Sequence, residues 1–166
     1  MNINCFYALT YKVSECNICL IQLLPHSILC SVNLPRRMMR HRKSELWIDE
    51  AINSDLFVKE SSFKMVPGLS GTGISFQSIT YPDRYVWHQN FKLYLHKNGN
   101  SYLFKQDATF TSHPGFEGSS VSFESVDFRG RFARASNFRV ILSTDDGSVQ
   151  FKKDASWKHF NKLNYF

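Results

Sequence analysis

A repeat of 47 residues constrains the fold of this chain more than any other feature of its sequence. The chain divides into three ungapped copies, residues 27–73, 74–120 and 121–166, which follow a leader of residues 1–26. Residues 47 positions apart are identical at many places, including Ser31, Ser78 and Ser125; Arg37, Arg84 and Arg131; His41 and His88; and Asn90 and Asn137. Repeated units of this kind cannot bury an apolar face alone, so we expect the copies to pack around one shared core.

The residue pattern inside the copies is typical of β-strands. Phe91, Leu93 and Leu95 alternate with more polar neighbours, which is the period-two pattern of a half-buried strand. Pairs such as Pro82-Asp83 and Asn98-Gly99 predict the turns between strands. We expect four short strands per copy, which in the middle copy are residues 74–79, 84–87, 91–96 and 101–104. No segment shows a convincing helical period, so we expect almost no helix.

The number of copies favours an all-β fold of the β-trefoil type. A propeller typically needs four to eight blades, and a solenoid leaves both of its ends exposed unless they are capped. Closure of three copies into a barrel with a hairpin cap removes most edge strands. Three sets of equivalent apolar positions are expected to face the common core: Leu46, Leu93 and Val140; Phe57, Phe104 and Phe151; and Phe63, Phe110 and Trp157.

Residues 1–26 and the charge balance give little guidance on location. The apolar stretch at residues 18–24 is long enough for a short signal-peptide core, but Lys12 is the one preceding cation and Glu15 opposes it. A cleaved signal and a leader unrelated to the fold are both possible interpretations of this segment. We expect a secreted protein, and a cytoplasmic one is the alternative. Nothing in the sequence is long and apolar enough to predict a membrane span.

The net charge of +6 permits an acidic partner without requiring one. The basic cluster at residues 36–43 resembles a nucleic-acid or localisation signal, but it aligns with strand residues of the other copies. A solvated strand-and-loop face is favoured, so we expect a monomer with no nucleic-acid partner. Cys16 and Cys19 have half of a zinc-ribbon spacing, and no second pair follows them. We therefore expect no metal and no cofactor.

Three segments together carry a resemblance to a known family. They are SFQSITYPDRYVWHQNF at residues 75–91, GNSYLFKQDATF at residues 99–110 and VSFESVDFRGRF at residues 121–132. This pattern resembles the arabinose-binding domain of arabinofuranosidase B, the family 42 carbohydrate-binding module, over residues 27–160. The resemblance implies a β-trefoil with up to one pocket per copy. Each pocket would receive a terminal arabinofuranosyl side chain of a polysaccharide such as arabinoxylan or arabinan, held by the His of R-Y-x-x-H and the Asp of F-x-x-D-A-T/S-F.

The copies keep this motif unequally. The middle copy has every polar position, the third copy has Ala135 in place of the His, and the first copy has Glu60 in place of the Asp. We therefore expect the middle copy to hold the best pocket, then the third, then the first. The candidate carbohydrate-binding residues are Tyr85, His88, Asn90, Tyr94 and Asp107 in the middle copy, Asn137 and Asp154 in the third, and His41 in the first.

These residue types suit a sugar. A carboxylate accepts charge-assisted hydrogen bonds from two adjacent hydroxyls, and a neutral imidazole donates through one nitrogen and accepts through the other. An aromatic face covers the apolar side of the sugar ring, and we expect Tyr85 or Tyr94 to provide it. Structural roles stay open: Asp107 and Asp154 could accept backbone N–H groups in a turn, and His88 could be a satisfied strand histidine.

Binding without catalysis is the expected activity. A glycosidase usually needs two carboxyls about 5–5.5 Å apart, or about 6.5–9.5 Å for inversion. Each copy offers one candidate carboxyl, and three-fold symmetry would place these in different lobes, so we expect no catalytic residues. The competing hypothesis is a β-trefoil interaction scaffold that has drifted from a sugar-binding ancestor and no longer binds sugar.

Overall fold

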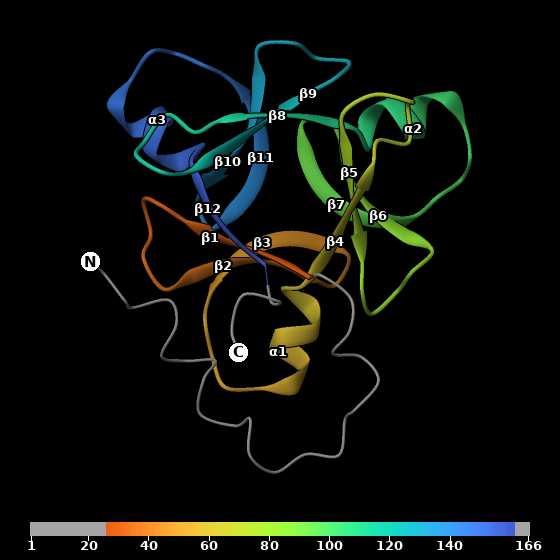
Figure 1. Ribbon diagram of the computed structural model, residues 1–166, viewed down its shortest axis with the longest axis horizontal. Coiled ribbons are helices and arrows are strands. Elements are labelled where there is room, and N and C mark those ends of the chain that lie inside the picture. The colour runs from red at the N-terminus through yellow and green to blue at the C-terminus, as the bar shows by residue number, and fades with distance from the viewer. Residues whose placement is uncertain (1–25, 162–166) are drawn as a thin grey trace.

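The computed structural model describes residues 26–161, which form an all-β domain with three short helices. The order strand, strand, strand, helix, strand occurs three times, and the three groups lie around the centre of the molecule (Figure 1). We call them the first, middle and third lobes. The first comprises β1 (Ser27–Ser31), β2 (Arg37–Arg42), β3 (Glu45–Glu50), α1 (Asp55–Glu60) and β4 (Phe63–Pro67). The middle comprises β5 (Ile74–Ser78), β6 (Arg84–Gln89), β7 (Lys92–Lys97), α2 (Tyr102–Asp107) and β8 (Phe110–Pro114). The third comprises β9 (Val121–Ser125), β10 (Arg131–Ser136), β11 (Arg139–Thr144), α3 (Val149–Asp154) and β12 (Trp157–Asn161).

Six strands close into a barrel. Long antiparallel ladders join β1 to β12, β4 to β5 and β8 to β9, each of which links two lobes. Single bridges join β1 to β4, β5 to β8 and β9 to β12 and complete the ring. Closure gives every barrel strand two neighbours, so the barrel has no free edge.

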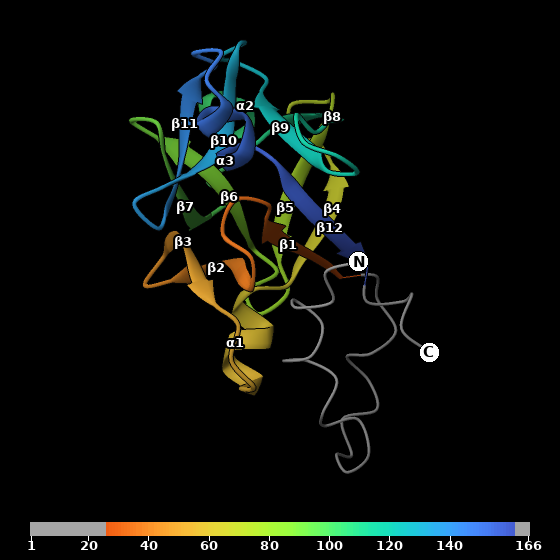
Figure 2. The ribbon, with the colours of Figure 1, turned by 90° about the vertical axis from the view of Figure 1, so that its left-hand side faces the viewer.

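Three hairpins cap one end of this barrel. They are β2–β3, β6–β7 and β10–β11, each paired over its full length. Figure 2 shows the hairpins on the left and the barrel strands on the right. The hairpins also pair with one another in a cycle through three bridges: Glu45 with Tyr94, Lys92 with Ile141, and Arg139 with Trp47.

The central core confirms two of the three expected sets of positions. Leu46, Leu93 and Val140, and Phe63, Phe110 and Trp157, are fully buried in one cluster inside the barrel and its cap. The set Phe57, Phe104 and Phe151 is also buried, but each of these rings belongs to a helix and lies outside that central cluster.

The expectations of almost no helix and of a strand at residues 101–104 are wrong. Those residues begin α2, and the fourth strand of the middle lobe is β8 instead. Ser101 caps α2 by accepting a hydrogen bond from the backbone N–H of Phe104, and Ser148 caps α3 in the same way. Each helix has six residues, so it is too short to show a helical period in the sequence. The first three strands of the middle lobe were predicted to within two residues.

The cap hairpins turn through residues with positive φ. Asn90 and Phe91 have φ of 50° and 60°, and Asn137 and Phe138 have 47° and 61°. Two successive left-handed residues are typical of a type I′ turn, in which Asn is favoured. Among the described residues, none of the helices has the length and apolar character needed to cross a membrane.

Candidate functional site

The structure brings His88 and Asp107 together, as the sequence predicted. His88 lies near the end of β6 on its inward face, and Asp107 is the last residue of α2. The distance from His88 Nε2 to Asp107 Oδ1 is 3.5 Å, and both side chains are more than nine-tenths buried. The turn of α2 and the end of the strand therefore aim two polar groups at one point.

The third lobe completes this cluster with two residues that sequence reasoning missed as site residues. Asp127 follows β9, and its Oδ1 lies 3.1 Å from His88 Nε2. The hydroxyl of Ser125 donates to the same carboxylate oxygen over 2.7 Å. The site thus lies between two lobes rather than inside one. We call His88, Asp107, Ser125 and Asp127 the His88 cluster.

A signal for Asp127 was present in the sequence. The equivalent residues of the other copies are Thr80 (127 − 47) and Asn33 (80 − 47), so the position is polar in all three copies. Because the three residues differ in type, identity between the copies does not single out this position. Ser125 is identical to Ser31 and Ser78, and this identity indicates the repeat rather than a binding site.

Three linked ionisation states follow from this packing. Burial, the hydrogen bond with Asp127 and the charge of Asp127 together raise the pKa of Asp107 to about 7. Burial acts in the same direction on Asp127, but hydrogen bonds from Ser125, His88 and Asp107 outweigh it and hold the pKa of Asp127 below its usual value. Burial lowers the pKa of His88, although the hydrogen bond and charge of Asp127 oppose this shift. At neutral pH the cluster therefore has an ionised Asp127, a neutral His88 and a partly protonated Asp107.

Two exposed phenylalanines form the rim of the cluster. The ring of Phe91 stacks near His88 at 6.4 Å between centroids, and the ring of Phe128 meets His88 edge-on at 5.3 Å. Both residues keep more than a third of their surface exposed. The guanidinium of Arg131 lies over the Phe91 ring at 4.1 Å and holds it in place. The cluster thus has an aromatic surface directly beside its polar groups.

The two tyrosines of the predicted site lie elsewhere. Tyr85 is three residues before His88 on β6, and because side chains alternate along a strand it points to the opposite face. Its hydroxyl accepts a hydrogen bond from Gln77. Tyr94 stacks on His96 of the same strand at 5.6 Å, and the guanidinium of Arg139 lies 5.8 Å from the centre of its ring. The expectation that either tyrosine lines the apolar side of the His88–Asp107 site is therefore corrected.

Asn90 and Asn137 occupy the same position in two hairpin turns. Their positive φ angles give each a clear backbone role, because Asn adopts the left-handed region more easily than most residues. Asn90 is next to Phe91, so it helps to position one side of the rim. A direct contact of either amide with a sugar stays a prediction.

The equivalent site after the first lobe has a histidine but no free carboxylate. His41 Nε2 lies 3.5 Å from Ser78 Oγ, and the ring of Tyr81 lies 5.8 Å from that of His41. Glu60, however, forms an ion pair with Arg40 at 2.9 Å. Burial, followed by the charges of Arg40 and Arg84, lowers the pKa of His41 to about 4, so this histidine is neutral at pH 7.

The equivalent site after the third lobe keeps its carboxylate but not its histidine. Asp154 Oδ1 accepts from the amides of Asn33 at 2.8 Å and Gln150 at 3.0 Å. Its Oδ2 lies 3.4 Å from Arg134 Nη1. With Ala135 at the histidine position, Asp154 is buried among donors of its own protein. Among the described residues, only the middle site therefore combines a histidine with a carboxyl that lacks a cationic partner.

The His88 cluster also has a donor set that a cation could use. One ligand atom from each of His88, Asp107 and Asp127 lies within 4.8 Å of the other two. The proton held by Asp107 would have to leave before all three could coordinate a metal ion. The leader cysteines considered in the sequence lie outside the described residues, and the expectation of no metal stays a prediction.

Comparisons with known proteins place the chain in a family and a fold. The model of the alpha-L-arabinofuranosidase B (ABFB) domain matches residues 50–121 and 116–164. No curated protein matches the sequence. A GH54 α-L-arabinofuranosidase soaked with a cyclic sulfate inhibitor is similar in structure, with a TM-score of 0.74 and 23% identity over 81% of this chain and 30% of that one.

Two further structures have the same fold. An arabinofuranosidase complexed with arabinofuranosyl-α-1,2-xylobiose gives a TM-score of 0.73 and 23% identity, over 82% of this chain and 31% of that one. The β-trefoil BEL gives a TM-score of 0.60 and 12% identity, over 82% of this chain and 92% of that one. This chain therefore spans about a third of the length of the two arabinofuranosidases and most of the length of the β-trefoil.

Proposed function

Because the chain belongs to the alpha-L-arabinofuranosidase B domain family, we propose that it is a carbohydrate-binding module for arabinofuranosyl side chains of polysaccharides such as arabinoxylan or arabinan. One observation carries the proposal: a buried histidine and two carboxyls converge beneath an exposed aromatic rim. A sugar needs both parts, because its hydroxyls require acceptors and donors while its C–H face prefers an aromatic ring.

The residues of the His88 cluster and of its aromatic rim have separate roles in this proposal. Asp107, once ionised, accepts from two neighbouring hydroxyls, and the neutral His88 exchanges a hydrogen bond with a third. Asp127 orients His88 through their 3.1 Å contact. Phe91 and Phe128 take the part that the sequence had assigned to Tyr85 or Tyr94, because they are the exposed aromatic residues in contact with His88.

The cluster is suited to binding rather than to glycoside hydrolysis. Its two carboxyls have pKa values shifted in opposite directions, which in an enzyme can mark an acid and a base. Here burial is the largest cause of the raised pKa of Asp107, and the hydrogen bond that it shares with Asp127 adds to the shift of one carboxyl and opposes that of the other. Carboxyls this close leave no room for the sugar carbon between them, since a glycosidase separates its pair by about 5 Å or more.

The three lobes, in this proposal, are copies of one ancestral unit with one working pocket left. In the first site the carboxylate of Glu60 is paired with Arg40, and in the third site Ala135 stands in place of the histidine. A single pocket binds weakly, so avidity would come from a partner domain or from several modules acting on one polysaccharide. A polysaccharide ligand also favours a secreted location, and a monomer is sufficient because the pocket is complete within one chain.

Calorimetric titration with an arabinofuranosyl xylo-oligosaccharide tests the proposal, with the unsubstituted xylo-oligosaccharide as the matched ligand. We expect binding of the first and not of the second. Asp107→Asn should lose roughly 1.5–3 kcal/mol, the range for a hydrogen bond to a charged group, which is a tenfold or greater loss of affinity. Asp154→Asn is the control, because its site lacks the histidine and its carboxylate is already occupied.

Two outcomes would contradict the proposal. If the parent protein binds neither oligosaccharide at millimolar concentration, the drifted scaffold replaces the sugar-binding module. If Asp154→Asn weakens binding while Asp107→Asn does not, the ligand belongs to the third site and the middle lobe is the wrong choice.

A further inference from the structure

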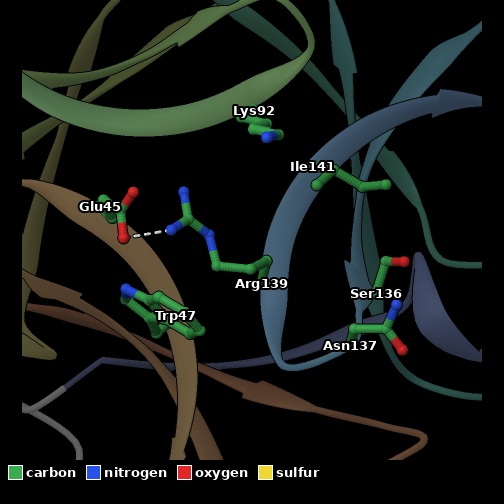
Figure 3. A pocket seen from close by; sticks show the side chains of 7 residues that line it. All are labelled: Glu45, Trp47, Lys92, Ser136, Asn137, Arg139 and Ile141. Carbon is green, nitrogen blue, oxygen red and sulfur yellow. Dashed lines mark ion pairs between the residues drawn. The ribbon is translucent and has the colours of Figure 1, made fainter.

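A cavity lies among the cap hairpins. Its volume is about 290 Å³, and none of its lining residues belongs to the cluster. Figure 3 shows Arg139 at its centre, reaching toward Glu45 across Trp47, with Lys92 above and Ser136 and Asn137 on the opposite side. The lining residues are Glu45, Trp47, Lys92, Ser136, Asn137, Arg139 and Ile141.

The repeat explains why charged groups converge here. Glu45, Lys92 and Arg139 are the same position in successive copies (92 − 45 = 47 and 139 − 92 = 47). Each is bridged to the next hairpin of the cycle, so the three backbones meet in one ring. Two cations and one anion at equivalent positions leave the ring with one positive charge in excess.

Arg139 is held rigidly yet keeps hydrogen-bonding capacity. Its Nη1 forms an ion pair with Glu45, and its guanidinium lies 4.4 Å from the centre of the Trp47 ring. Its Nε and Nη2 atoms are buried, and neither has a hydrogen-bond partner among the described residues. An unpaired buried donor is costly, so a small movement of the side chain that exposes one of these atoms to an anion gains a charge-assisted hydrogen bond that the unliganded protein lacks.

We propose that this cavity binds a monosaccharide that carries a carboxylate, a sugar of the uronic acid class. The carboxylate pairs with Arg139 and Lys92, which supply the excess positive charge. The hydroxyls use the remaining polar groups, namely the carboxylate of Glu45, the hydroxyl of Ser136 and the amide of Asn137. The volume is near the lower end for ligand pockets, which fits one ring rather than a chain of sugars.

The donor and acceptor set excludes two simpler ligands. A neutral sugar leaves Lys92 and the unpaired guanidinium donors without an anion. A small inorganic anion satisfies those donors, but it has no hydroxyl for Glu45 to accept from. A ligand with both a carboxylate and hydroxyls uses the two kinds of group together.

NMR titration of the intact, uniformly ¹⁵N-labelled chain with D-glucuronate tests this, because the indole N–H of Trp47 reports on the cavity. D-glucose and sulfate are the matched ligands without the carboxylate and without the hydroxyls. We expect glucuronate to shift the Trp47 signal saturably and to bind at least about fivefold more tightly than either comparator. Lys92→Gln should weaken glucuronate binding several-fold, and Glu45→Gln should weaken it less or strengthen it, since it also frees Arg139 Nη1.

Comparable affinity for glucose would overturn the proposal, as would comparable affinity for sulfate or unchanged binding in Lys92→Gln. Absence of any saturable shift of Trp47 would also overturn it. Asp107→Asn is the matched control for the His88 cluster and should leave glucuronate binding unchanged. This variant separates the two sites, so the failure of one proposal leaves the other standing.

Discussion

Asp107 holds a proton at pH values where an exposed aspartate has lost it, because burial and Asp127 raise its pKa to about 7. A carboxyl that is partly protonated at neutral pH loses its proton readily when a ligand donates hydrogen bonds to it. Ionisation next to Asp127 is unfavourable in the unliganded protein, and sugar hydroxyls would relieve it by donating to both carboxylates. Asp107 is therefore expected to lower the free energy of unfolding and to raise the affinity for sugar.

Stability as a function of pH provides a direct test. Unfolded Asp107 ionises near pH 4, whereas the folded residue ionises near 7. Between these values the folded state binds more protons than the unfolded state, so the free energy of unfolding falls as pH rises. Asp107→Asn removes this fall. We therefore expect the Tm of the variant minus the Tm of the parent to be larger at about pH 8 than at about pH 4. An equal Tm difference at both pH values in thermal melts would show that Asp107 titrates normally.

His41 predicts the opposite pH dependence in the first lobe. Its pKa is lowered to about 4, so between that value and 6.5 the unfolded state binds more protons than the folded state. The contribution of neutral His41 to stability is therefore full above pH 6.5 and is lost as pH falls toward 4. We expect the Tm of the parent to drop more on acidification from about pH 7 to about pH 4.5 than the Tm of His41→Asn. Equal drops in calorimetry would assign the acid sensitivity to other groups.

The short helices give a prediction at the scale of elements. Ser101 caps α2 with a 3.1 Å hydrogen bond from the Phe104 N–H, whereas Ser54 occupies the same position before α1 without a side-chain cap bond. Ser101→Ala should lower the free energy of unfolding by about 1 kcal/mol, and Ser54→Ala should lower it by much less. Urea denaturation of both variants measures this difference. Equal losses would mean that the cap bond does not stabilise α2.

The sequence predicted those elements whose pattern is local and long enough to detect. Strand β7 was found because alternation over six residues is visible in a sequence, and β5 and β6 were found because predicted turns separate them from their neighbours. The helices were missed because one and a half turns carry no measurable period, and Ser101 reads equally well as a turn residue. The correct face of Tyr85 could have been predicted, since an odd spacing from His88 on one strand always means opposite faces.

The site could be predicted only in part, because it is a property of the whole molecule. His88 and Asp107 belong to one lobe, and the resemblance to the family's motif predicted both. Asp127 and Phe128 come from the next lobe, and their approach to His88 depends on how the lobes close around the barrel. Identity between copies could not reveal this contact, because position 127 differs in every copy.

Barrel closure leads to a prediction that involves the whole molecule. Strand β1 pairs with β12 at five positions, from Ser27 with Asn161 to Ser31 with Trp157, and it joins the first lobe to the third. All five of its residues are buried. Burial of Ile28 and Leu29 contributes about 1.5–3 kcal/mol each, a large share of the 5–15 kcal/mol that stabilises a typical domain.

A chain that begins at Val32 should therefore lose its cooperative thermal transition. It should also lose sugar binding at the His88 cluster, although β1 contributes no residue to that site, because the third lobe would no longer be held against its neighbours. The control is a chain that begins at His26, which retains β1 and lacks only residues 1–25, and which we expect to melt near the Tm of the parent. Calorimetry and oligosaccharide titration of both chains measure the two effects. If the chain beginning at Val32 still unfolds cooperatively and binds sugar, the middle and third lobes are stable without barrel closure, and the site belongs to that pair of lobes alone.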